Sequence, residues 1–186
     1  MSLPTLYKGA GPGTHWHDND ARVQGFVCAQ SRPPTANAIV THITNYSHPS
    51  PYLSFSTSFA VARQYALSGP GGIASAADPG YVYEVDLAAC TGGHSTFNAV
   101  IFNPVKVLAD LGISHQHNGN QALIVGVASG SPHDPVLVTV IPHAGGGMTL
   151  PTVTKELKAL VYSLRDAEVL ITQVPAACVI NRHNVY

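Results

Sequence analysis

The hydrophobic pattern of residues 52–66 changes period part of the way along, and this change constrains the fold more than any other feature. Its first half alternates between apolar side chains and serines: Leu53, Ser54, Phe55, Ser56. This alternation predicts a strand with one apolar face and one hydroxyl-lined face. From Phe59 onward apolar residues recur at helical spacing, and Ser58 suits the N-cap because its hydroxyl can accept a free backbone N–H. The sequence therefore predicts a strand that leads into a capped helix, with small polar donors at an edge suited to holding a ligand or a catalytic carboxylate.

Composition limits the kinds of function open to the chain. Its 186 residues, 45% of them apolar, suit one domain with a substantial core. Charged residues make up only 10%, against about 25% in ordinary domains, and the net charge of -1 gives no electrostatic footprint for nucleic acid. No apolar run approaches the roughly 20 residues of a membrane-spanning helix. We therefore expect no membrane association, and we expect a monomer.

The cellular compartment stays open from the sequence. The first residues lack the basic-then-apolar pattern of a signal peptide, so a cytoplasmic protein and a secreted effector or toxin domain are both compatible with them. The three cysteines, Cys28, Cys90 and Cys178, are widely spaced and form neither a disulfide framework nor a C-x-x-C motif. One disulfide bridge with one remaining thiol is compatible with this spacing.

Other segments carry clear secondary-structure patterns. The expected strands are 3–10, 81–87, 122–128, 136–141 and 174–180. The expected helices are 105–111 and 155–164, whereas 36–43 suits either a helix or a strand. The nearly all-apolar 122–128 predicts a central strand. His42 is a candidate site residue, although such a histidine is more often hydrogen-bonded at the edge of a core.

Two His-x-His pairs, at 15–17 and 115–117, raise the question of metal binding. A zinc site needs three or four ligands at defined spacing, and no further pair completes either one. We interpret both regions as solvated loops and expect no metal.

Two acids, Asp166 and Glu168, stand at the start of a branched apolar run. On a strand, residues two apart share a face, and close like charges raise at least one pKa. Such pairs can divide the work between charge stabilisation and general-base catalysis. Taken alone, this stretch favours a pair of solvated acids.

Three pieces of the sequence in their order resemble the mono-ADP-ribosyltransferase superfamily, in its cholera-toxin-like branch. That branch carries an Arg on its first strand, a Ser-Thr-Ser motif on a middle strand and a Glu-x-Glu or Gln-x-Glu motif near its end. The matching residues here are Lys8, Ser56-Thr57-Ser58 and Asp166-Ala167-Glu168. The resemblance implies an α+β fold, with two packed, mostly antiparallel β-sheets that form an NAD cleft with flanking helices. Residues 1–186 would be a single catalytic domain, in which 91–150 exceeds the family core and is a candidate insertion.

The resemblance also implies a role for each matching residue. Glu168 would bind the ribose 2′-hydroxyl of NAD and stabilise an oxocarbenium-like transition state as nicotinamide leaves. Ser56 would hydrogen-bond Glu168 and orient it, and Asp166 would orient or deprotonate the acceptor. The NAD-binding residues would be Tyr7, Lys8, Gly9, Thr57 and Ser58, with Lys8 at the pyrophosphate.

Two departures from the family pattern leave the acceptor open among a protein, a nucleobase and a small molecule. Lys8 replaces the family Arg and cannot make a planar bidentate clamp. Asp166 replaces Glu or Gln and is one methylene shorter than either. Two alternatives of the same fold remain: an NAD glycohydrolase, in which water is the acceptor, and a non-catalytic module that binds NAD or ADP-ribose.

Overall fold

The computed structural model describes residues 5–28, 35–45, 49–91 and 165–186, together with isolated positions and short strands between 101 and 163. The strands are β1 (Leu6–Ala10), β2 (Phe26–Val27), β3 (Leu53–Ser56), β4 (Ser68–Gly69), β5 (Gly72–Ile73), β6 (Gly80–Val85), β7 (Ile101–Phe102), β8 (Gln116–His117), β9 (Asn120–Gln121), β10 (Leu123–Ala128), β11 (Val136–Pro142), β12 (Met148–Thr149), β13 (Glu168–Ile171), β14 (Gln173–Val174) and β15 (Val179–Val185). The helices are α1 (His15–Asp18), α2 (Ala21–Gln24), α3 (Ala36–Thr44), α4 (Phe59–Ala66), α5 (Leu87–Thr91) and the 3-10 turn η1 (Ala176–Cys178).

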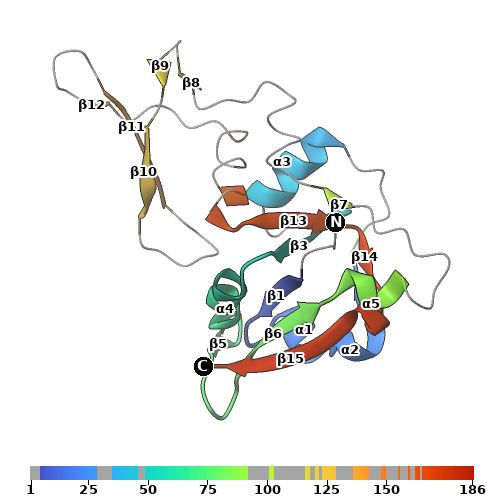
Figure 1. Cartoon of the computed structure of the whole chain (residues 1–186). Helices are drawn as coiled ribbons and strands as arrows, with labels where there is room; N and C mark the ends of the chain where they lie inside the picture. Colours follow the sequence, from blue (N-terminus) through green and yellow to red (C-terminus); the bar gives the residue numbers. More distant parts are fainter. Residues whose placement is uncertain are drawn as a thin grey trace.

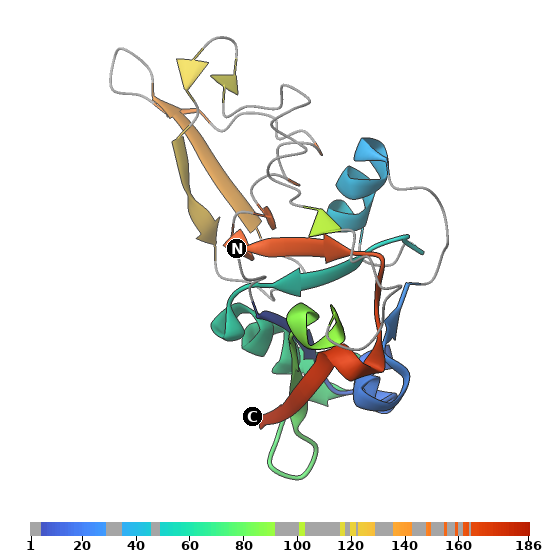
Figure 2. The ribbon, with the colours of Figure 1, turned by 45° about the vertical axis from the view of Figure 1, so that its right-hand side comes forward.

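The protein is α+β, and its main sheet has six strands in the order β15-β6-β1-β3-β13-β7, all paired antiparallel (Figure 1). The expected α+β class is confirmed, and the described residues also form a three-stranded sheet, β10-β11-β12, and three two-stranded ones. The middle of the main sheet is narrow, because β1 and β3 share a single register pair, Tyr7 with Ser56. Both ribbon views show β3 and β13 on one side of this junction and β6 and β15 on the other (Figures 1 and 2).

The expected strand-to-helix unit is confirmed. Leu53 and Phe55 are buried on β3, and α4 begins directly after Ser58, whose hydroxyl accepts the backbone N–H of Val61. Gly9 of β1 lies against this helix so closely that a Cβ there would clash with the backbone carbonyl of Ala62. The glycine therefore allows α4 to pack flat on β1, which fixes the position of the serine-bearing strand next to it.

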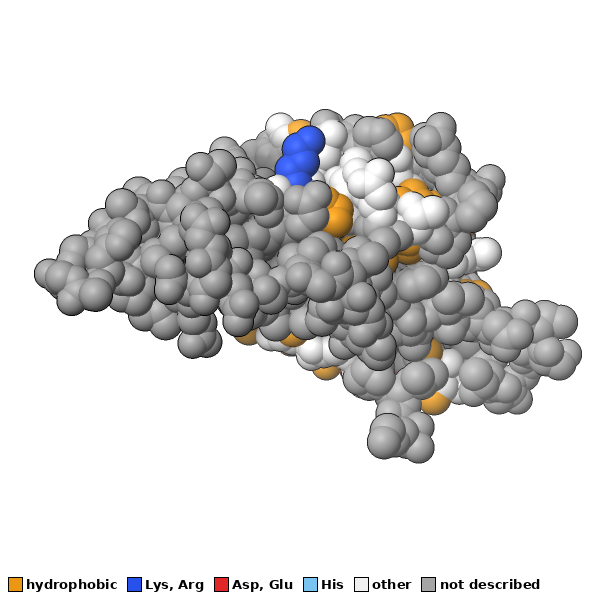
Figure 3. Space-filling model, turned by 90° about the horizontal axis from the view of Figure 1, so that it is seen from above, with side chains coloured by type: hydrophobic (Ala, Val, Ile, Leu, Met, Phe, Trp, Pro, Cys, Tyr) orange, Lys and Arg blue, Asp and Glu red, His pale blue; other side chains and the backbone are white. Residues whose placement is uncertain are grey.

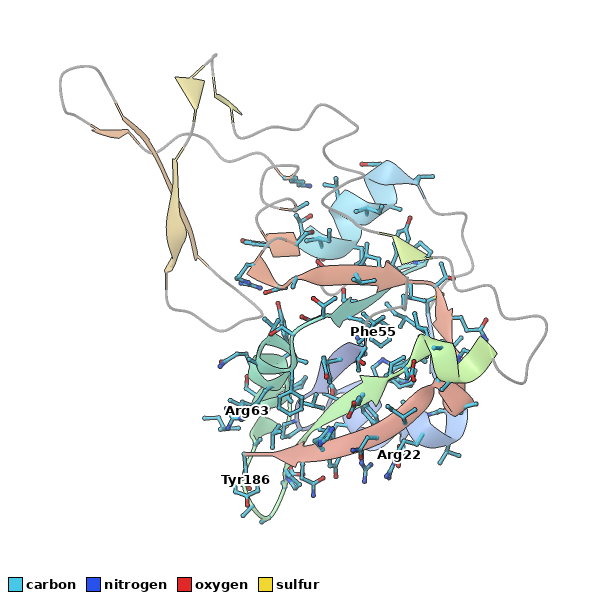
Figure 4. All side chains as sticks on the ribbon, in the orientation of Figure 1. Arg22, Phe55, Arg63 and Tyr186 are labelled. Atoms are coloured by element: carbon cyan, nitrogen blue, oxygen red, sulfur yellow. The ribbon has the colours of Figure 1, made fainter. Side chains whose placement is uncertain are left out.

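An aromatic cluster forms the centre of the described core. The Phe26 ring lies 4.8 Å from that of Trp16, 5.2 Å from Phe55 and 5.4 Å from Tyr83, measured between centroids, each in an edge-to-face arrangement. Such pairs add about 0.5–1.5 kcal/mol beyond the burial of area. Figure 4 labels Phe55, which lies where the two parts of the sheet meet. Through Phe26, the cluster therefore connects Phe55 of β3 to Tyr83 of β6, on the two sides of the junction.

Several expected elements need correction. The predicted loop at 15–20 contains the short helix α1, and Asp20 caps α2 by accepting the N–H of Arg22. The 36–43 segment is a helix, α3, capped by Thr35. The strand expected to be central, 122–128, is instead β10 at the edge of a three-stranded sheet that extends away from the core in both ribbon views.

Other expectations are met in part or lie outside the described residues. The strands expected at 3–10, 81–87 and 136–141 are present as β1, β6 and β11. The strand expected at 174–180 is displaced, since η1 occupies Ala176–Cys178 and β15 begins only at Val179. The described positions of the expected 155–164 helix are helical, and Ala159 and Ser163 in it are fully buried. The helix expected at 105–111 lies outside the described residues.

Cys178 is disulfide-bonded and Cys28 retains its thiol, which agrees with the single bridge that the sequence allows. Among the described residues, no helix is both long and apolar enough to cross a membrane. Figure 3 views the molecule from above, and in the described part of that face a basic side chain lies beside hydrophobic and uncharged polar atoms.

Candidate active site

A cavity of about 570 Å³ lies beside the β1–β3 junction, with lining residues from both strands. Tyr7, Lys8 and Gly9 line it from β1, and residues 53–56 line it from β3. Its volume falls within the range of about 300–1,000 Å³ that is usual for small-molecule sites. The predicted site residues Ser56, Asp166 and Glu168 also line it.

Glu168, the first residue of β13, is hydrogen-bonded by Ser54. The Ser54 hydroxyl donates to Glu168 Oε1 over 2.5 Å. The expectation that Ser56 makes this bond is wrong, because the Ser56 hydroxyl donates to the backbone carbonyl of Asp166 at 2.6 Å and accepts the N–H of Ser58. Ser56 therefore holds the turn before β13, and Ser54 holds the carboxylate.

The strand register explains this exchange of roles. Glu168 lies directly opposite Ser56, and Leu170 lies opposite Ser54. Ser54 and Ser56 share the hydroxyl face that the alternation predicts, so both serines lie on the side of the Glu168 carboxyl. Diagonal neighbours across a strand pair are within reach of long side chains, and glutamate is long enough to contact the diagonal serine.

His42 of α3 extends this contact into a chain of hydrogen bonds. Its Nε2 lies 2.7 Å from the Ser54 hydroxyl, and its Nδ1 lies 2.6 Å from the Ser50 hydroxyl. The Ser50 oxygen in turn accepts the backbone N–H of Tyr52. Three side chains from separate segments thus connect to the Glu168 carboxyl in one line.

The direction of this chain follows from counting protons. When Ser54 donates its single hydroxyl proton to the carboxylate, His42 Nε2 must donate to Ser54. Burial, together with the nearby Lys8 charge, lowers the pKa of His42 to about 4, so the ring is neutral and its Nδ1 accepts from Ser50. His42 therefore fixes the Ser54 hydroxyl as a donor toward Glu168.

The Glu168 carboxyl titrates near neutrality. Burial raises its pKa to about 7, the Ser54 hydrogen bond opposes that rise, and the neighbouring Asp166 charge adds to it. The sequence predicts a raised pKa from two close acids, whereas the larger cause here is removal from water. The Glu168 carboxyl is therefore mostly ionised above about pH 7, and its charged form is poorly solvated because the group is buried.

Lys8 supplies a cation to the same cavity. Its Nζ donates to the backbone carbonyl of Ser54 at 3.0 Å and lies 5.5 Å from the centroid of the Phe55 ring. Burial lowers the pKa of Lys8 to about 8, and the Glu168 charge opposes that change. An anionic ligand in the cavity would favour the charged ammonium, since a desolvated cation gains most from an opposite charge.

Asp166 occupies a different setting from the one expected. It lies in a turn before β13, and Ala167 has a φ of 45°, so the two acids do not share a strand face. Arg165 donates to both Asp166 oxygens, Nε to Oδ1 at 2.5 Å and Nη2 to Oδ2 at 2.6 Å. The Tyr65 hydroxyl donates to Oδ2 as well, at 2.5 Å. The predicted acceptor-activating carboxylate is thus already ion-paired within the protein.

The remaining predicted NAD contacts divide into two groups. Tyr7 and Gly9 line the cavity, although the packing of α4 already accounts for the glycine. Thr57 and Ser58 lie outside the lining, because Thr57 is exposed and the Ser58 hydroxyl caps α4. The structure therefore brings Tyr7, Lys8, Gly9, Ser56, Asp166 and Glu168 to one cavity and leaves those two residues outside it.

Sequence reasoning did not assign Ser50, Ser54 or Arg165 to the site. The serine alternation marks Ser54 as well as Ser56, but the pattern alone does not give the register that selects between them. Ser163 also approaches Glu168 Oε2, at 3.4 Å, while its proton is directed to the Ala159 carbonyl at 2.8 Å. Within the described part of the chain, no three His, Cys, Asp or Glu side chains are grouped to hold a metal ion.

Comparison with known proteins adds no assignment, since no family model, curated protein or solved structure gives a significant match to the chain. The function is therefore argued from the cavity and its residues.

Proposed function

We propose that the protein transfers ADP-ribose from NAD to an acceptor and releases nicotinamide. The observation that carries this proposal is the meeting of Glu168, Ser54 and Lys8 in one cavity of suitable size. A buried carboxylate suits a sugar that becomes cationic, and a buried ammonium suits a pyrophosphate. The family resemblance of the sequence supports the same assignment independently.

The chemistry follows from where charge develops. Loss of nicotinamide leaves positive charge on the ribose carbon and ring oxygen. A carboxylate that is already oriented beside that carbon lowers the barrier, since it does not have to reorganise during the reaction. Ser54, whose hydroxyl is oriented by His42, would orient the Glu168 carboxylate. Lys8, on β1, would bind the pyrophosphate.

Measurement of nicotinamide release tests the proposal directly. Purified protein with NAD should release nicotinamide, and Glu168→Gln should lower the rate by about 10² or more, as loss of a preorganised electrostatic partner does. Glu84→Gln is the matched control, because Glu84 lies on β6, pairs with His183 at 2.9 Å and is outside the cavity lining. Its rate should stay close to that of the wild type.

The alternatives give different results in the same experiment. A wild-type rate no higher than that of Glu168→Gln would contradict catalysis, and NAD binding without release would indicate a non-catalytic module. Nicotinamide release with free ADP-ribose as the sole product would indicate a glycohydrolase. Mass spectrometry of lysate components after incubation with labelled NAD would identify a modified acceptor.

A further inference from the structure

Arg165, Asp166 and Tyr65 are hydrogen-bonded to one another at the edge of the cavity. Besides its two bonds to Asp166, Arg165 Nη2 donates to the Tyr65 hydroxyl at 2.6 Å, and the guanidinium lies 5.3 Å from the centroid of the Tyr162 ring. The Arg165 and Asp166 side chains are only 22% and 14% exposed. A bidentate ion pair this shielded from water holds its geometry more firmly than an exposed pair does.

The cluster faces the reacting groups, because Asp166, Tyr65 and Tyr162 line the same cavity as Glu168. Among the described residues, Lys8, Asp166 and Glu168 line the cavity, and Arg165 is paired with Asp166 at its edge, so these four charges sum to zero when all are ionised. In the proposed reaction Glu168 is engaged by the ribose, so a cationic acceptor beside it needs a second carboxylate to accept its hydrogen bonds. Asp166 lines the cavity and could accept such hydrogen bonds, but both of its oxygens already accept hydrogen bonds from the Arg165 guanidinium.

We infer that Arg165 excludes guanidinium acceptors, so that the acceptor is an uncharged hydroxyl or amino nucleophile. This inference rests on the proposed function. An arginine-like acceptor would have to displace Arg165 and leave a second, half-buried cation without its partner. A neutral acceptor does not have to displace Arg165 from Asp166, and it brings no additional charge into the cavity.

The transfer balances for a neutral acceptor. The bond between the ribose carbon and the nicotinamide nitrogen breaks, and its electron pair stays on nicotinamide, which leaves uncharged. A lone pair of the acceptor oxygen or nitrogen forms the new bond at the same carbon. The acceptor proton then passes to solvent, so one proton appears for each ADP-ribose transferred.

Binding of two matched probes tests the inference without requiring activity. Butylguanidinium and butylurea have almost the same shape, and only the first carries a charge. At pH 5.5, where the Glu168 carboxyl is mostly protonated, calorimetric titration of the wild type should show no preference for butylguanidinium. Arg165→Gln frees the Asp166 carboxylate and should gain at least about a tenfold preference for it. Arg165→Gln combined with Asp166→Asn is the control and should lose that preference.

Each result either supports the inference or overturns it. A wild type that binds butylguanidinium tighter than butylurea overturns it, and that measurement needs no variant. An Arg165→Gln protein that unfolds at the wild-type temperature yet gains no preference also overturns it. Nicotinamide release in the same samples tests the proposed function separately, so its failure leaves the result of the probe titration readable.

Discussion

The two acids of the site differ in what surrounds them, although one residue separates them in sequence. The Glu168 carboxyl is held by the Ser54 hydroxyl in a buried setting, and its pKa rises to about 7. The Asp166 carboxyl accepts three hydrogen bonds, two from the Arg165 guanidinium and one from the Tyr65 hydroxyl. Glu168 is therefore a poorly solvated carboxyl, whereas the charge of Asp166 is compensated by its ion pair with Arg165.

This difference separates a group that can respond to a ligand from one that maintains structure. A buried carboxylate whose hydrogen-bond donors are neutral gains energy when positive charge develops beside it, because its donors and the Lys8 charge together do not offset the cost of its burial. A carboxylate already paired with an arginine gains much less. The Glu168 side of the cavity is therefore suited to chemistry, and the Asp166 side to shaping the cavity.

Stability should respond to the two acids with opposite signs. The folded pKa of Glu168 is about 7 against an ordinary 4.5, so its ionised form destabilises the fold progressively from pH 4.5 to 7. At pH 8, Glu168→Gln should raise the free energy of unfolding by up to about 3 kcal/mol. Asp166→Asn should lower it by about 1–3 kcal/mol, because Arg165 loses its partner. Urea unfolding measures both.

The control for this prediction is the same pair of unfolding curves at pH 4. There the Glu168 carboxyl is mostly protonated in both the folded and the unfolded states, so the stabilisation by Glu168→Gln should largely disappear. If Glu168→Gln is instead as destabilised at pH 8 as Asp166→Asn, Glu168 is a structural ion-pair partner and the prediction fails.

The two serines of β3 should separate activity from stability. Ser54→Ala removes the donor to Glu168 and should lower kcat/KM for nicotinamide release by roughly tenfold to a hundredfold. Ser56→Ala should leave that rate within about fivefold and cost about 1 kcal/mol of stability, since its hydroxyl ties Asp166 and Ser58. If Ser56→Ala lost more activity than Ser54→Ala, Ser56 and not Ser54 would be the serine that orients Glu168, as the family resemblance implies.

That exchange of serines shows how far the sequence leads. Alternation is a property of single strands, so the hydroxyl face of β3, the Ser58 cap and the early cation could all be predicted. Which serine meets Glu168 depends on pairing between segments more than one hundred residues apart, and no local pattern contains that register.

The ion pair between Arg165 and Asp166 cannot be predicted from the sequence for a similar reason. The branched residues after Glu168 favour a strand, so the sequence predicts both acids on that strand. Ala167 with its positive φ breaks that strand and places Asp166 in a turn, where the preceding arginine can reach both of its oxygens. Likewise, His42 could be noticed in the sequence, but its place beside Ser54 depends on how α3 sits over β3.

The pH dependence of activity should reflect the buried acid and the buried base together. Glu168 must be ionised to stabilise the cationic sugar, so kcat/KM should rise with pH through about 7. Lys8 must be protonated to hold a pyrophosphate, so kcat/KM should fall above about 8. The profile should be a narrow bell, reduced roughly fivefold to tenfold at pH 6 and at pH 9 relative to its maximum.

Lys8→Arg sharpens this last prediction. A guanidinium does not lose its proton in this range, so the alkaline limb should disappear and the acid limb should stay near 7. Lys155→Arg, at an exposed position outside the cavity lining, should leave both limbs unchanged. If the alkaline limb survives in Lys8→Arg, another group controls it, and the assignment of Lys8 to an anionic part of the substrate fails while that of Glu168 stands on its own limb.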